Sequence, residues 1–165
     1  MVKPRPETAG PGQESVWTYP RPPRVEPSLE YVRIALAGEI VAESTVSIRV
    51  LETSHPPSYY LPRACFAEGA LVAVDGHTVC EWKGRAHYAD LVAGSARAER
   101  VAWTYPSPAE GFTTLVDHWA VMPGGLVSCW VDDEPVQPQS GGFYGGWITH
   151  RVVGPFKGGP GTWGW

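Results

Sequence analysis

Lys83 lies in a segment that could carry chemistry, between Trp82 and Gly84 in the run from Cys80 to Tyr88. An amine buried among aromatic rings loses hydration, so its pKa falls and it can act as a base or a nucleophile. Glu52 is the second candidate, because it continues the face of an alternating apolar strand, where a carboxylate needs a cation, a donor or a proton. Lys83 and Glu52 are therefore the candidate catalytic residues.

Each of these two residues also has a purely structural interpretation. On strict alternation Lys83 shares a strand face with Val79 and Glu81, and that face could simply be the solvent side. Glu52 could form an ion pair with Arg63 or Lys83 that holds two strands together. The sequence leaves both interpretations open.

Aromatic residues predominate among the other candidates and could line a cleft for a planar ligand. The candidate ligand-binding residues are Tyr60, Arg63, Cys80, Trp82, Tyr88, Trp103 and Tyr105. Aromatic residues at strand spacing are more often core than binding site, so we expect only one or two of these rings to contact a ligand. Cys80 is expected to be a small buried hydrophobe rather than a nucleophile.

Composition limits the class of protein. The 165 residues predict one domain, and a net charge of −4 without long like-charge runs argues against binding of nucleic acid or a membrane surface. Cys65, Cys80 and Cys129 are too few and too widely spaced for a zinc motif, so we expect reduced thiols, no metal and no cofactor. The start of the chain has no apolar stretch, and no run approaches about 18 apolar residues, which predicts a soluble, cytoplasmic protein.

Short strands separated by turn residues predict an all-β domain over residues 29–138. Ala37-Gly38 is typical of a tight hairpin turn between strands at 31–36 and 39–42. Further strands are expected at 46–52, 59–61, 71–74, 78–83, 87–92, 101–103, 117–122 and 128–132. The clearest helix signal is Ser107-Pro108-Ala109-Glu110, which predicts a helical turn near 108–113.

Two Pro- or Gly-rich arms flank the expected domain. Residues 1–28 are predicted to be partly disordered, with 1–14 free and Trp17 and Tyr19 docked on the domain. Residues 139–165 form a Gly- and Trp-rich arm for which two interpretations stay open. It wraps the domain or a neighbouring subunit, or it is a mobile tail.

The order of five short motifs resembles the uncharacterised family catalogued as domain of unknown function 427. The motifs are Gly-Glu-x-x-Ala at 38–42, Val-Leu-Glu-Thr at 50–53, Tyr-Tyr-Leu-Pro-Arg at 59–63, Cys-x-Trp-Lys-Gly-x-x-x-Tyr at 80–88 and Ala-Trp-x-Tyr-Pro-x-Pro at 102–108. The resemblance covers about residues 30–135 and implies a β-tent fold, in which two antiparallel sheets meet at an angle. The chain departs from the family pattern at Ala64-Cys65, where an acidic pair is common, and at Glu81, where a proline is common.

The family also carries a nucleotidyltransferase label, which the residues of this chain do not favour. The best acidic cluster, Asp132-Asp133-Glu134, precedes Pro135 and is typical of a hairpin turn. Metal-assisted phosphoryl chemistry needs fixed carboxylates and a phosphate-binding loop, and no Gly-rich loop leads from a strand into a helix.

Three hypotheses of function follow. In the first, the domain binds an unknown small planar molecule in an aromatic-lined cleft, with Glu52, Arg63 and Lys83 fixing its polar edges. In the second, it is a metal-independent enzyme that uses Lys83 as base or nucleophile and Glu52 as acid. In the third, it is a structural module that forms a homo-oligomer through its aromatic arms. We favour the first hypothesis.

Overall fold

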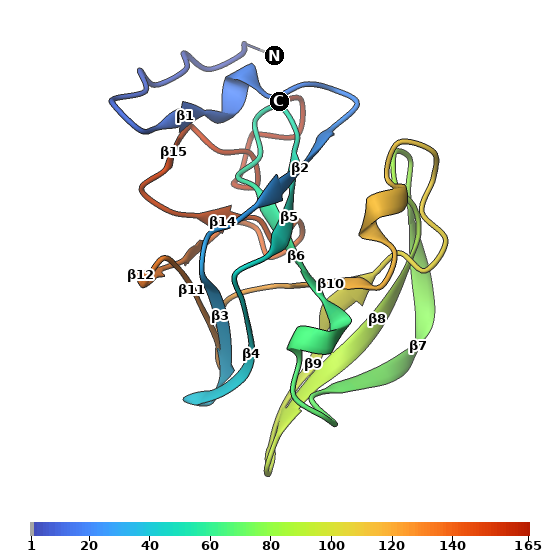
Figure 1. Cartoon of the computed structure of the whole chain (residues 1–165). Helices are drawn as coiled ribbons and strands as arrows, with labels where there is room; N and C mark the ends of the chain where they lie inside the picture. Colours follow the sequence, from blue (N-terminus) through green and yellow to red (C-terminus); the bar gives the residue numbers. More distant parts are fainter. Residues whose placement is uncertain (1) are drawn as a thin grey trace.

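The computed structural model describes residues 2–165, and β-strands are its main regular elements (Figure 1). The larger sheet is antiparallel and contains, in spatial order, β2 (Arg24–Ser28), β5 (Ser47–Leu51), β6 (Ser58–Pro62), β10 (His118–Val121), β9 (Ala96–Thr104), β8 (Gly84–Ala93) and β7 (Leu71–Cys80). The smaller sheet contains β12 (Glu134–Pro135), β11 (Val127–Val131), β3 (Val32–Leu36) and β4 (Glu39–Ser44). The all-β fold class with antiparallel sheets is confirmed.

Short elements complete the fold. Strand β1 (Glu14–Ser15) pairs in parallel with β15 (Val152–Val153), and β13 (Gln137–Pro138) pairs with β14 (Trp147–Ile148). Residues 2–165 also contain three single-turn 3-10 helices, η1 (Val16–Thr18), η2 (Arg63–Cys65) and η3 (Thr113–Leu115). The expected helical turn near 108–113 thus lies slightly later, because the chain first turns at Gly111, whose φ is +88°.

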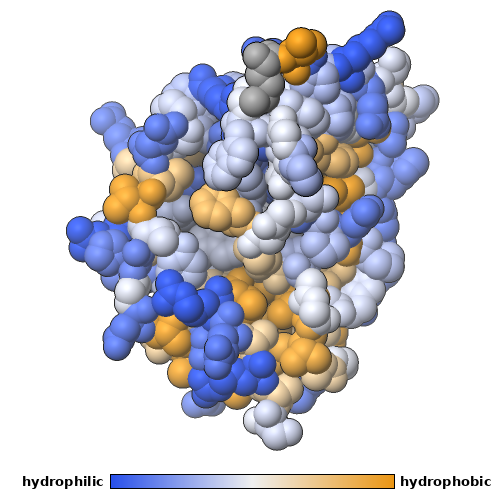
Figure 2. All heavy atoms as spheres, turned by 180° about the vertical axis from the view of Figure 1, so that it is seen from behind, coloured by the Kyte–Doolittle hydropathy of each residue, from blue (hydrophilic) through white to orange (hydrophobic). Residues whose placement is uncertain are grey.

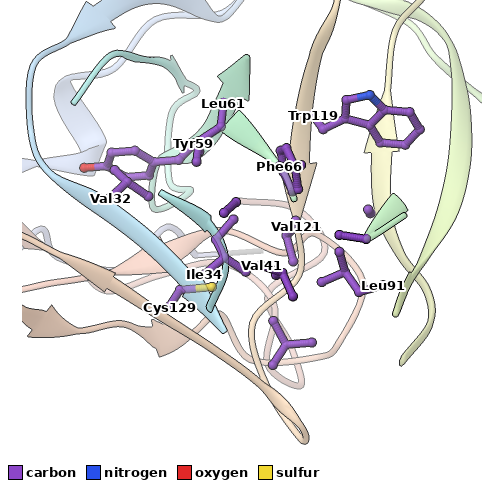
Figure 3. Packing of buried hydrophobic residues seen from close by; sticks show 14 of the residues in the cluster. Val32, Ile34, Val41, Tyr59, Leu61, Phe66, Leu91, Trp119, Val121 and Cys129 are labelled. Carbon is purple, nitrogen blue, oxygen red and sulfur yellow. The ribbon is translucent and has the colours of Figure 1, made fainter. Parts of the chain in front are cut away.

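The main core lies between the two sheets. Figure 3 shows side chains of the smaller sheet, such as Ile34 and Cys129, directed toward Leu91 and Val121 of the larger sheet. Strand alternation sends neighbours to opposite faces, so Tyr59 enters this core while Tyr60 joins a second cluster on the other side of the sheet. The larger sheet is therefore apolar on both faces over part of its area.

Two hairpins show what the turn residues do. The turn between β3 and β4 uses Ala37 and Gly38, both with positive φ, as their sequence predicts. The strands expected at 71–74 and 78–83 are one strand, β7, which ends at Cys80. The prediction that a strand extends to Lys83 is wrong, because residues 81–83 form the turn that leads into β8. Strand alternation therefore does not determine where the Lys83 side chain points.

The terminal segments lie against the sheets. Strand β2 puts residues 24–28 into the larger sheet, before the expected domain boundary at residue 29. Trp17 donates a hydrogen bond from Nε1 to the Pro155 carbonyl oxygen at 2.9 Å. Trp147 is fully buried and stacks on Tyr59, with 5.0 Å between ring centroids. The C-terminal segment, residues 139–165, thus wraps the domain and contributes to its core.

The molecular surface is mixed in character. The face seen in Figure 2 has a large hydrophobic patch below its centre and smaller ones nearer its edge, among mostly hydrophilic residues. No helix in the described part of the chain is long and apolar enough to cross a membrane.

Candidate functional site

A cavity of about 460 Å³ opens on the second face of the larger sheet. Seven of the side chains that line it are aromatic, namely Tyr60, Trp82, Tyr88, Trp103, Tyr105, Phe143 and Tyr144. Its polar and charged lining comprises Glu52, His55, Ser58, Thr78, Glu81, Lys83, Arg100 and Lys157. The cavity therefore combines aromatic side chains with several polar groups that can fix the orientation of a ligand.

The floor of the cavity is a row of side chains across four adjacent strands. Tyr60 on β6 pairs with Ala120 on β10, Ala120 pairs with Trp103 on β9, and Trp103 pairs with Tyr88 on β8. Because Ala120 is small, Trp103 can reach across it and donate from Nε1 to the Tyr60 hydroxyl oxygen at 3.0 Å. The register of the sheet thus fixes both rings before any ligand binds.

The turn between β7 and β8 forms one wall. The Ala109 amide donates to the Lys83 carbonyl oxygen at 2.9 Å, and Gly84 lies against the Ser107–Ala109 backbone, where a Cβ atom would make ordinary van der Waals contact. Gly84 also has a φ of +106°, a conformation that favours glycine. These contacts hold Lys83 against the aromatic cluster, with Nζ 5.6 Å from the centroid of the Tyr105 ring.

The charge state of Lys83 differs from the expectation of a lowered pKa. Burial lowers the pKa of the ammonium, but the neighbouring Tyr60 and Cys80, with Glu52, raise it by more, so the pKa lies above its ordinary value. A lysine with a raised pKa is a cation at neutral pH. It can attract an anion or orient a polar group, whereas action as a base or amine nucleophile would require loss of that proton.

The C-terminal segment supplies the opposite wall. Gln139 organises it, because its Nε2 donates to the Lys157 carbonyl oxygen at 2.7 Å and its Oε1 accepts from the Gly146 amide at 3.0 Å. Gly145 crosses directly above Trp103, where a Cβ atom would lie 2.7 Å from the indole ring. The segment can pass over the aromatic floor only because this residue is glycine. Tyr144 is thereby placed over the cavity.

Glu52 and His55 lie where the two walls meet. Glu52 accepts from Arg21, with 3.2 Å between Oε2 and Nε, and the His55 Nε2 atom lies 3.6 Å from the same oxygen. Burial, together with the nearby cations Lys157, Arg21 and Lys83, lowers the pKa of His55 to about 3. The imidazole is therefore neutral at physiological pH, and its Nδ1 lies 3.2 Å from the Gln139 amide nitrogen.

The structure brings together all but one of the predicted site residues. Glu52, Tyr60, Cys80, Trp82, Lys83, Tyr88, Trp103 and Tyr105 line the same cavity. Arg63 does not, because η2 begins at this residue and turns it into a separate hollow beside Phe66 and Asp117. The Glu52 carboxylate forms its ion pair with Arg21. The sequence had suggested Arg63 or Lys83 as the partner.

Sequence reasoning missed the residues that reach the cavity from distant segments. These are His55, Ser58, Thr78, Arg100, Met122, Phe143, Tyr144 and Lys157. One available signal was the scarcity of lysine, since two of the three lysines in the chain, Lys83 and Lys157, line this cavity. No group of three or more His, Cys, Asp or Glu side chains in residues 2–165 is arranged to hold a metal ion.

An all-β domain with an aromatic cavity on one face of its larger sheet is the class that these observations define. Residues 24–133 match the family described as Domain of unknown function (DUF427), and the chain belongs to this family. This confirms the resemblance seen in the five motifs. No curated protein matches the chain. The matched region includes the cavity floor and the β7–β8 turn, but not the C-terminal wall formed by Phe143, Tyr144 and Lys157.

Proposed function

We propose that this protein binds a small planar molecule in the cavity beside Lys83. The observation that carries the proposal is the aromatic row of Tyr60, Trp103 and Tyr88, which presents fixed rings to a space of about 460 Å³. Cavities of roughly 300 to 1,000 Å³ with mostly apolar walls and a few polar groups are typical small-molecule sites.

The polar groups of the cavity favour binding over catalysis. Lys83 keeps its proton and His55 is held neutral, so neither has the protonation behaviour of a base that works near pH 7. The Glu52 carboxylate is already bound by Arg21. These groups can orient a ligand by hydrogen bonds and charge, which a binding protein requires.

The test compares flat aromatic fragments with their saturated-ring counterparts in a thermal-shift assay followed by calorimetric titration. We expect the indole and naphthalene fragments to bind and the cyclohexyl analogues of equal polarity to bind at least about ten-fold more weakly, because only flat rings stack on the aromatic floor. Equal binding of aromatic and saturated fragments, or binding of neither, would contradict the proposal.

Two exposed aromatic residues give a matched pair of variants. Phe143 lines the cavity and Trp163 does not, yet their exposed fractions are similar, 73% and 77%. Phe143→Ala is expected to weaken fragment binding by several-fold, and Trp163→Ala is expected to leave it unchanged. Neither substitution removes a buried core side chain, so a loss of binding would not be explained by unfolding.

A further inference from the structure

Three cationic side chains line the cavity, and each of them lies over a tyrosine ring. Lys83 Nζ is 5.6 Å from the Tyr105 ring centroid, and Lys157 Nζ is 5.5 Å from that of Tyr144. The guanidinium carbon of Arg100 is 4.7 Å from the Tyr88 ring centroid at the rim. The β7–β8 turn, strand β9 and the C-terminal segment thus each place a cation over a tyrosine ring beside the cavity.

A tyrosine ring holds a cation differently from a carboxylate. The negative face of the ring attracts the cation and fixes its position, but the ring carries no net charge, so the positive charge is not neutralised. Among residues 2–165, no Asp or Glu carboxylate lies within ion-pair distance of Lys83, Arg100 or Lys157. The Arg100 guanidinium donates to the main-chain oxygen of Asp75 at 2.8 Å. The Lys157 ammonium donates at 3.3 Å to the oxygen of Trp165, the last residue of the sequence, which also accepts from Arg21 at 3.0 Å.

The carboxylates of the cavity do not cancel this charge. Two carboxylates, of Glu52 and Glu81, line the cavity beside the three cations, and Glu52 is bound by Arg21. The cavity therefore has an excess of positive charge in a protein whose net charge is −4. The lowered pKa of His55 agrees with this, because after burial its causes are the three cations Lys157, Arg21 and Lys83.

We infer that the ligand is a planar aromatic anion, with its ring on the tyrosine and tryptophan floor and its carboxylate or phosphate between Lys83 and Lys157. This inference rests on the proposed function and narrows the class of ligand. Ammonium donors that are positioned and still charged form strong hydrogen bonds with an anion, and the partly enclosed setting reduces screening by salt. A cationic ring of the same shape meets repulsion at both walls.

The experiment uses probes that share a ring and differ in charge. Calorimetric titration of the full chain compares indole-3-propionate, 3-methylindole and tryptamine, which are anionic, neutral and cationic near neutral pH. Adenosine and adenosine monophosphate form a second pair that separates phosphate from carboxylate as the source of charge. We expect the anionic member of at least one set to bind about ten-fold more tightly than its neutral counterpart.

Lysine variants test whether the two lysines cause the preference. Lys83→Met and Lys157→Met keep much of the side-chain length without the charge. Each is expected to weaken binding of the anion by a larger factor than binding of the neutral probe, so that most of the preference for the anion is lost. Lys3→Met is the control, because Lys3 is exposed and does not line the cavity. Raised salt is expected to weaken binding of the anion and not of the neutral probe.

The outcomes distinguish the inference from the proposed function. If 3-methylindole or tryptamine binds as tightly as indole-3-propionate, and adenosine as tightly as its monophosphate, the inference is overturned and the aromatic site stands. If no probe binds even at millimolar concentration, both are overturned. An anion preference that survives both lysine substitutions also overturns the assignment to Lys83 and Lys157.

Discussion

The protein contains two groups of cationic side chains whose partners differ. In the first group Arg49 is fully buried and donates to Glu14 at 2.7 Å and to Glu26 at 3.0 Å. Arg151 joins it through Glu14 at 2.9 Å and Glu30 at 2.8 Å. In the second group the three cavity cations lie over tyrosine rings instead.

This difference separates the cations that stabilise the fold through ion pairs from those that can still bind an anionic ligand. The Arg49 group connects the segment before η1, strands β2 and β5, and the C-terminal segment, so its charges are consumed in holding distant parts of the chain together. A buried charge with carboxylate partners is costly to disrupt, because removal of one member leaves the others unpaired. Within residues 2–165 the three cavity cations have no Asp or Glu partner, and the anionic group of a ligand can take that place.

The largest expected effect is that of Arg49→Met on stability. We expect the free energy of unfolding to fall by about 3 kcal/mol or more, because Glu14 and Glu26 lose a buried partner. Urea unfolding followed by fluorescence measures this. Arg85→Met is the control, since Arg85 is exposed on β8 and should change stability by less than about 0.5 kcal/mol. Equal effects of the two substitutions would show that the Arg49 group is not structural.

A second prediction concerns the dependence of stability on pH. The pKa of His55 is about 3 in the folded protein and 6.5 when unperturbed, so in this range the unfolded chain binds the additional proton. The contribution of His55 to stability is complete above about pH 6.5 and is lost as the pH falls, by up to about 1.4 kcal/mol per pH unit.

His55→Asn isolates this contribution, because the Asn carbonyl oxygen can still accept from Gln139 but has no proton to gain. We expect stability to fall less steeply with pH in the variant than in the natural protein between about pH 6 and about pH 4. Urea unfolding at a series of pH values measures the two slopes. Parallel slopes would mean that His55 is not held neutral by its surroundings.

The smallest expected effect is that of Lys83→Met on stability. Because Lys83 has no carboxylate partner in residues 2–165, its replacement leaves no anion unpaired, and we expect a change of less than about 1 kcal/mol in either direction. The same urea experiment measures it beside Arg49→Met. A loss as large as that of Arg49→Met would remove the distinction between the two groups of cations.

The sequence predicted most of the fold because its strands carry clear local signals. Alternation and the Ala37-Gly38 turn indicated β3 and β4 correctly. The end of β7 was missed, since Glu81, Trp82 and Lys83 have no turn residue among them and only Gly84, with its positive φ, marks the hairpin. The course of the C-terminal segment depends on contacts such as that of Trp147 with Tyr59, which no local pattern contains.

The site was predictable where its residues share strands and motifs, and not where distant segments supply them. Tyr60, Trp103 and Tyr88 meet through sheet register, and the family motifs pointed to them. Tyr144 and Lys157 come from outside the matched region, in a Gly-rich segment whose path no periodicity defines. The partner of Glu52 was missed for the same reason, because Arg21 approaches from the N-terminal segment.

The most direct test of the account is a footprint of lysine reactivity. The chain has only three lysines, and mass spectrometry of acetylated peptides measures the labelling rate of each with and without indole-3-propionate. We expect the ligand to protect Lys83 and Lys157 together and to leave the labelling rate of Lys3 unchanged. If Lys83 and Lys157 are labelled at the same rates with and without indole-3-propionate, at a concentration where calorimetry detects binding, the placement of the anion between these two lysines is contradicted.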